Sequence, residues 1–94
     1  MNSHQLFIET LIEAVNRNPH IRKARIIAEV QAPEKMGELR RLEEEILRRA
    51  EAGENPWAYL HLWASRTAAL EKAFAGEDIH VVTHGRARDA TGHL

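Results

Sequence analysis

The chain has 94 residues, of which 44% are hydrophobic and 29% charged, the composition of one small globular domain and not of a disordered segment. Thirteen basic and fourteen acidic residues leave a net charge of −1, so no global field favours a polyanion such as nucleic acid. The absence of cysteine excludes disulfides, thiolate zinc sites and cysteine nucleophiles.

The first predicted helix runs from about Asn2 to Arg17. Asn2 and Gln5 have the spacing of a capping box, in which each side chain satisfies a free backbone N–H of the first turn. Apolar residues then recur on one side of a helical projection. They are Phe7, Ile8, Leu11, Ile12 and Val15.

The next segment, residues 18–31, is compatible with a helix or with a strand. Asn18–Pro19 is a helix start signal, and a helix here would carry an unusually wide apolar arc. Read as a strand, residues 24–30 alternate between apolar and polar positions, and their β-branched side chains suit a sheet. Pro33 ends either element because it disfavours the αR conformation at Ala32. We favour the helix and keep the strand as the alternative.

A helical hairpin, residues 33–51 and 56–75, dominates the sequence. Pro33 suits the first turn of the first helix, and Gly53 suits a left-handed cap after its end. Glu44–Arg48 and Glu45–Arg49 have the favourable spacing for ion pairs on one helix. The predicted buried stripe of this helix contains Met36, Leu39, Leu42, Ile46, Leu47 and Ala50.

The second helix of the hairpin has start and stop signals in Asn55, Pro56 and Gly76. It contains both tryptophans and the only tyrosine, so we expect it to form the centre of the core. Its main apolar seam follows a 3-4 spacing and consists of Leu60, Trp63, Thr67, Leu70 and Phe74.

This second helix also carries more apolar surface than one seam requires. Leu62 lies with three alanines on a strip away from the seam, and that strip needs either residues 18–31 or another subunit to cover it. Glu43, on the first helix, falls inside an apolar arc. One interpretation places it at the rim of the stripe, and another places it in a buried ion pair with His61, Arg66 or an arginine of a second subunit. The predicted partner interface is Glu43, Ala58, Leu62, Arg66, Ala69 and Ala73.

Two other constellations give weaker hypotheses. A basic run at residues 17–25 indicates a possible nucleic-acid patch, although no DNA-binding motif accompanies it. His80 and His84 could hold a metal, but four-residue spacing in a strand-like context separates them too widely. The cations of the basic run are Arg17, Arg22, Lys23 and Arg25.

The sequence therefore predicts a mainly α protein, a small helical bundle built on the hairpin with a short C-terminal strand or arm. The alternative fold is α+β, with strands near 24–30 and 78–83. Residues 1–84 would form a single helical domain and residues 85–94 a C-terminal tail. No apolar run approaches the ~18–20 residues of a membrane span, and no signal-peptide pattern is present, so we expect a cytoplasmic protein without membrane contact.

The expected function is non-enzymatic: a protein–protein interaction module, acting as a small dimerising adaptor, inhibitor or regulatory subunit. We find no nucleophile elbow, phosphate-binding loop or paired carboxylates, and we expect no cofactor. The expected partner is a second copy of the chain or another protein. A nucleic-acid-associated regulator using residues 17–25 is the alternative, and a metal-dependent protein with histidines near residues 80–84 is a weaker one.

Overall fold

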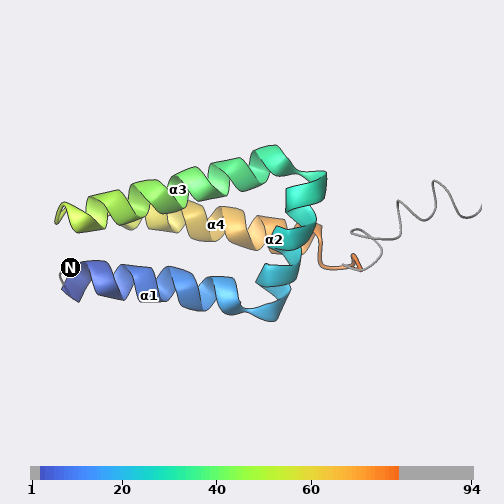
Figure 1. The fold of residues 1–94 in the computed structure, drawn as a ribbon, viewed down its shortest axis with the longest axis horizontal. Coiled ribbons are helices and arrows are strands. Elements are labelled where there is room, and N and C mark those ends of the chain that lie inside the picture. Colours follow the sequence, from blue (N-terminus) through green and yellow to red (C-terminus); the bar gives the residue numbers. More distant parts are fainter. Residues whose placement is uncertain (1–2, 79–94) are drawn as a thin grey trace, which may run out of the picture.

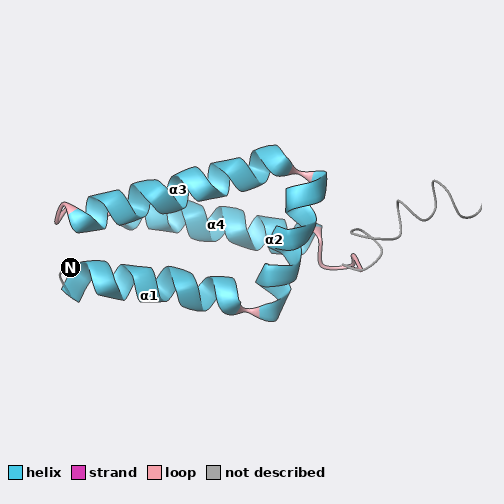
Figure 2. Ribbon diagram, in the orientation of Figure 1, coloured by secondary structure: helices cyan, strands magenta, loops and turns pink. Residues whose placement is uncertain are grey.

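Residues 3–78 fold into a bundle of four helices. A computed structural model describes residues 3–78, with α1 at Ser3–Arg17, α2 at Pro19–Gln31, α3 at Pro33–Glu51 and α4 at Trp57–Ala73. The three longer helices, α1, α3 and α4, lie side by side, and α2 crosses one end of them (Figure 1). No strand occurs within residues 3–78 (Figure 2), so the predicted helical bundle is confirmed.

The alternative strand at residues 24–30 is wrong because this segment lies inside α2. The Asn18 side chain accepts hydrogen bonds from the backbone N–H groups of His20 and Ile21, and Pro19 fills the first turn. The buried face of α2 is narrower than its apolar arc in the sequence, since Ile26 and Val30 are exposed. The residues of α2 that are buried follow helical spacing and are Ala24, Ile27 and Ala28. The second alternative strand, near 78–83, extends beyond the described residues, as do the predicted tail and both histidines of the metal hypothesis.

The hairpin between α3 and α4 forms as the sequence indicates. Gly53 has a φ of 80°, the left-handed conformation that an L side chain rarely adopts. The N–H of Glu54 bonds to the carbonyl of Arg49 at 2.8 Å, and that of Gly53 bonds to Ala50 at 3.1 Å, which is a Schellman cap. Asn55 then accepts the N–H of Trp57 at 2.9 Å and starts α4.

The end of α4 lies earlier than the sequence indicated. The helix stops at Ala73, and the N–H of Phe74 bonds to the carbonyl of Leu70 at 3.2 Å. Gly76 follows in a turn and does not adopt a positive φ, so it does not act as a left-handed cap.

The hydrophobic core lies mainly between α3 and α4 and where α2 packs against the end of the bundle. Trp63 is only 1% exposed, and burying a tryptophan removes roughly 150–250 Å² from water, worth on the order of 4–6 kcal/mol. The predicted seam of α4 is confirmed: Leu60, Trp63, Thr67 and Leu70 are buried and Phe74 is half-buried.

The third pair of long helices, α1 and α4, is more widely separated than the other two pairs. α1 and α3 pack together, as do α3 and α4, but no Cα atom of α1 comes within 8 Å of one in α4. α1 and α4 run in the same direction, and α3 runs in the opposite direction (Figure 1). The backbones of α1 and α4 are therefore farther apart than those of the helix pairs in contact, and side chains of both helices line a groove between them. In the described residues, no helix combines the length and apolar character needed to cross a membrane.

Candidate interaction surface

A network of polar side chains centred on Glu43 joins all four helices. The Oε2 atom of Glu43, on α3, accepts three hydrogen bonds: from Asn16 Nδ2 of α1 at 3.1 Å, Arg25 Nη1 of α2 at 2.9 Å and Trp63 Nε1 of α4 at 2.9 Å. Its Oε1 atom faces Arg25 Nη2 at 3.4 Å. The side chains of Arg25 and Glu43 are only 19% and 15% exposed, so this ion pair is largely removed from water.

This geometry corrects the interpretation of Glu43. The carboxylate forms an ion pair inside the fold and does not lie at the rim of the stripe. Its partner is Arg25, and neither His61 nor Arg66 takes that role. Because Glu43 is satisfied by α1, α2 and α4 of its own chain, we do not carry it into the partner interface. A carboxylate held by several donors is suited to fixing the relative positions of helices.

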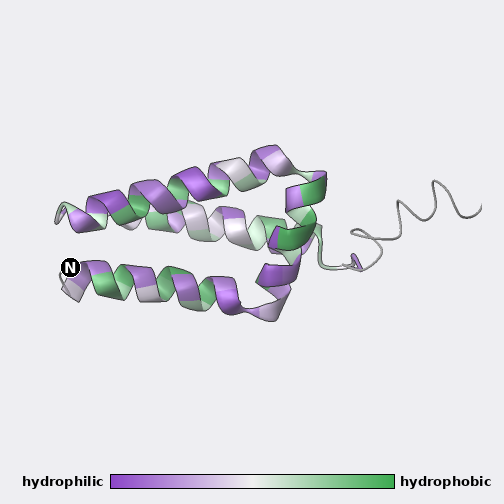
Figure 3. Ribbon diagram, viewed as in Figure 1, coloured by the Kyte–Doolittle hydropathy of each residue, from purple (hydrophilic) through white to green (hydrophobic). Residues whose placement is uncertain are grey.

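The exposed side of α4 combines apolar side chains with a stretch that lacks charged residues. Between Asn55 and Ser65 the sequence contains no Asp, Glu, Lys or Arg. Trp57 is 63% exposed and Leu62 39% exposed within this stretch. The ribbon of α3 is largely hydrophilic in colour, whereas pale and apolar segments are frequent along α4 (Figure 3). Ala58, Ala69 and Ala73 are also exposed, so α2 does not cover the predicted strip.

A groove of about 340 Å³ follows one flank of α4, on the open side of the bundle. α1 contributes two aliphatic side chains to it, and α4 contributes both tryptophans together with smaller residues. The lining residues are Leu11, Val15, Trp57, Leu60, His61, Trp63 and Ala64. No acid, lysine or arginine lines it, so it suits an apolar occupant.

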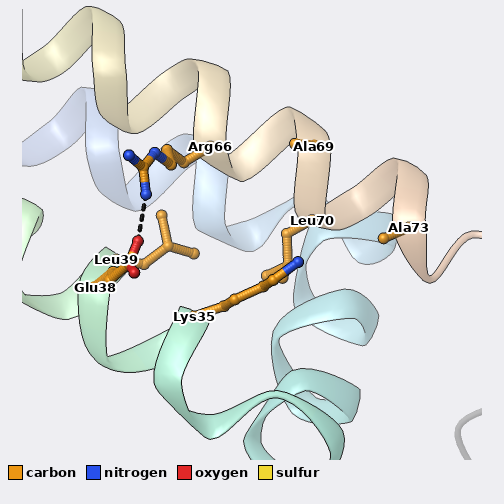
Figure 4. A pocket seen from close by; sticks show the side chains of 7 residues that line it. All are labelled: Lys35, Glu38, Leu39, Arg66, Ala69, Leu70 and Ala73. Carbon is orange, nitrogen blue, oxygen red and sulfur yellow. Dashed lines mark hydrogen bonds and ion pairs between the residues drawn. The ribbon is translucent and has the colours of Figure 1, made fainter.

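A second groove, of about 270 Å³, follows the other flank of α4, next to α3. Figure 4 shows Arg66 paired with Glu38 at one end of this groove (left in the view) and Lys35 extended beside Leu70. Ala69 and Ala73 line its α4 wall. Three predicted interface residues therefore border one groove, but charged groups at its rim make it more polar than the groove between α1 and α4.

The predicted basic patch is largely engaged within the chain. Arg17 pairs with Glu13 on the same helix, and Lys23 Nζ donates to the carbonyl oxygen of Ala75 at 3.0 Å. Arg25 belongs to the network around Glu43. Arg22 is exposed. Three of the four cations thus make separate contacts within the chain, and nucleic-acid binding through these residues stays a prediction.

Other charged groups lie on the surface of α3 and interact locally. Glu45 bonds to both Arg48, at 2.5 Å, and Arg49, at 2.6 Å. Hydrogen bonds from Arg48 and then Arg49 hold the pKa of the Glu45 carboxyl below its ordinary value. Among the residues that the structure describes, no three His, Asp or Glu side chains are grouped so that they could hold a metal ion.

Two parts of this arrangement were missed by reading the sequence. The first is the participation of Asn16 and Trp63 in the network, for which the only local signal is that a buried indole N–H needs an acceptor. The second is the role of Leu11 and Val15 as one wall of a groove, because their spacing fits an ordinary core position.

No family model matches this chain, and neither a curated protein nor a solved structure matches it.

Proposed function

We propose that this chain is a non-enzymatic protein–protein interaction module, a small adaptor, inhibitor or regulatory subunit that binds its partners through α4. The observation that carries the proposal is the uncharged, exposed surface from Asn55 to Ser65, in a chain with 29% charged residues. Charged residues are depleted at the centres of protein interfaces, where tryptophan is enriched. Trp57, exposed over 63% of its surface, is a candidate anchor for such contacts.

The polar groups that converge in this fold support binding more than catalysis. Asn16, Arg25, Glu43 and the indole of Trp63 are bound to one another at the junction of the helices. A catalytic group must instead face a site that a substrate can occupy. The two grooves beside α4 are lined mainly by apolar side chains, which is the usual character of a surface that receives another helix.

The test uses two matched substitutions at exposed leucines. Leu62→Glu places a carboxylate on α4, and Leu6→Glu places one on α1, where the leucine is 54% exposed and borders neither groove. Tagged wild-type chain and both variants are used as bait in an extract of the source cells, together with untagged chain carrying a distinguishable mass label. Each retained protein is then purified, and its dissociation constant is measured by titration calorimetry.

We expect at least one retained foreign protein whose binding is weakened on the order of tenfold or more by Leu62→Glu and unchanged by Leu6→Glu, because only the former buries an unpaired charge. Circular dichroism confirms that both variants fold. The proposal is refuted if every retained foreign protein binds both variants equally, or if neither a foreign protein nor a second copy is retained.

A further inference from the structure

The long helices occupy three corners of a four-helix bundle. α3 packs against α1 and against α4, while no Cα atom of α1 lies within 8 Å of one in α4. In a four-helix bundle each helix contacts two neighbours and faces a third across the core, so α1 and α4 are placed as the diagonal pair. The fourth corner, opposite α3, is the position of the apolar groove lined by Leu11, Val15, Trp57 and Ala64.

The geometry restricts what can fill this corner. Neighbouring helices in a bundle with alternating directions run antiparallel. Because α1 and α4 run in the same direction, a helix that lies between them must run opposite to both (Figure 1). It must also present an uncharged strip, because no cation or carboxylate lines the groove to pair with a buried charge.

We propose that the occupant is α4 of a second copy of this chain, related by a two-fold axis perpendicular to the helix. Such an axis makes the partner's α4 antiparallel to α4 and α1 without further conditions. It also makes the contact reciprocal: each α4 enters the groove of the other copy, so both open corners close together. This inference rests on the proposed function and names the partner for the groove between α1 and α4.

The composition of α4 fits this role on both sides of the contact. Trp57, His61, Ala64 and Ala68 recur at intervals of 4, 3 and 4 residues on the flank that faces the groove. Ala64 and Ala68 are exposed and small, which allows two helix backbones to approach closely. Trp57 lies at one end of the strip, where the second copy would cover an indole that the single chain leaves 63% exposed.

Sedimentation velocity between about 1 and about 100 μM tests the inference, a range in which modest interfaces dissociate. We expect a monomer–dimer equilibrium for the full chain. Ala64→Glu should raise the dimer dissociation constant on the order of 100-fold, because each dimer would bury two unpaired carboxylates. The matched control is Ala69→Glu, the same change on the same helix but on the flank next to α3. It should leave the dissociation constant within about threefold, as expected for a site outside the contact.

Single cysteines provide a second measurement, since the chain has none of its own. Under mild oxidation a mixture of His61→Cys and Ala64→Cys chains should form a disulfide between copies, because the antiparallel contact places residue 61 of one copy beside residue 64 of the other. A mixture of Ala64→Cys and Ala69→Cys chains should not, because a disulfide needs Cα atoms roughly 4.4–6.8 Å apart. A strict monomer overturns the inference, and so does a dimer broken by Ala69→Glu but not by Ala64→Glu. Either result leaves the proposed function standing if a foreign protein still loses affinity for the Leu62→Glu variant. Loss of that selectivity as well would overturn both.

Discussion

Replacing Glu43 by glutamine isolates the contribution of charge at the junction of the four helices. The amide has nearly the shape of the carboxylate, so the change creates no cavity. Its oxygen can replace Oε2 and still accept from Asn16, Arg25 and Trp63, but these bonds become neutral on the acceptor side. Its NH₂ group takes the place of Oε1, which lies 3.4 Å from Arg25 Nη2 in the wild-type chain. Two hydrogen-bond donors then face each other, because Arg25 Nη2 is also a donor.

The expected loss of stability follows from these contacts. Hydrogen bonds to charged groups contribute about 1.5–3 kcal/mol and neutral ones about 0.5–1.5 kcal/mol, so neutralising the bonds from Asn16 and Trp63 loses about 1 kcal/mol each, or about 2 kcal/mol together. The ion pair with Arg25 adds to this, although less than the roughly 3–5 kcal/mol lost when a fully buried pair is broken, because its side chains keep 19% and 15% of their exposure. We expect Glu43→Gln to lower the free energy of unfolding by about 2–3 kcal/mol.

Urea unfolding followed by circular dichroism and tryptophan fluorescence measures this loss. With a slope of about 1–2 kcal/mol per M, the midpoint should fall by roughly 1–3 M. Glu44→Gln is the matched control, since Glu44 is the next residue of α3 and is exposed. It should change stability by less than about 0.5 kcal/mol. Equal midpoints for the two variants would refute the reasoning, as would a coupling energy near zero in a double-mutant cycle with Arg25→Met.

Four further substitutions test other parts of the fold, the first three by the same unfolding assay and the last by its dependence on pH. Thr67→Val should stabilise by about 1 kcal/mol, because the buried Thr67 Oγ1 has no hydrogen-bond partner and valine keeps the shape of threonine; a loss of stability would show that the hydroxyl is satisfied in solution. Gly53→Ala should lower the free energy of unfolding by about 1 kcal/mol, because Gly53 has a positive φ. Gly37→Ala should raise it by a similar amount, since a Cβ at Gly37 meets only a side-chain nitrogen at 3.5 Å. A change of the same sign in both variants would contradict this. Glu45→Gln should flatten the dependence of stability on pH. The pKa of Glu45 is depressed by Arg48 and Arg49, so its contribution is present at neutral pH and is lost as the pH falls through the folded-state value; acid unfolding identical to wild type would exclude this contribution.

Local signals in the sequence predicted the elements well and the long-range contacts poorly. The hairpin follows from Gly53 and Asn55, whose conformations depend on neighbours a few residues away, and the seam of α4 follows from helical spacing. The end of α4 was misplaced by two residues because Gly76 resembles a cap without acting as one. Residues 18–31 were ambiguous because their apolar arc is compatible with both periods, and the cap at Asn18 decides for the helix.

The partner of Glu43 depended on information that no local pattern contains. The helical projection showed that this carboxylate lies on an apolar arc, and burial then required a cation. Arg25 is 18 positions away, on the polar side of a helix whose orientation was unknown, and it resembled a member of a basic surface patch. The excess apolar surface of α4 was visible in the sequence. The groove between α1 and α4 was not visible in the sequence, because it depends on the separation between these two helices.

The network around Glu43 and the open surface of α4 are connected through Trp63. A helix that is apolar on most sides can be rotated about its axis with little change in buried apolar area, so hydrophobic burial alone does not determine which side faces solvent. The indole N–H of Trp63 removes this freedom, because it reaches Glu43 Oε2 at 2.9 Å in only one rotation of α4. That rotation turns Leu62 and Ala69 toward solvent and Ala64 toward the groove. The carboxylate thereby helps to determine which apolar strip of α4 is exposed, and under the proposed function it would influence binding without contacting the partner.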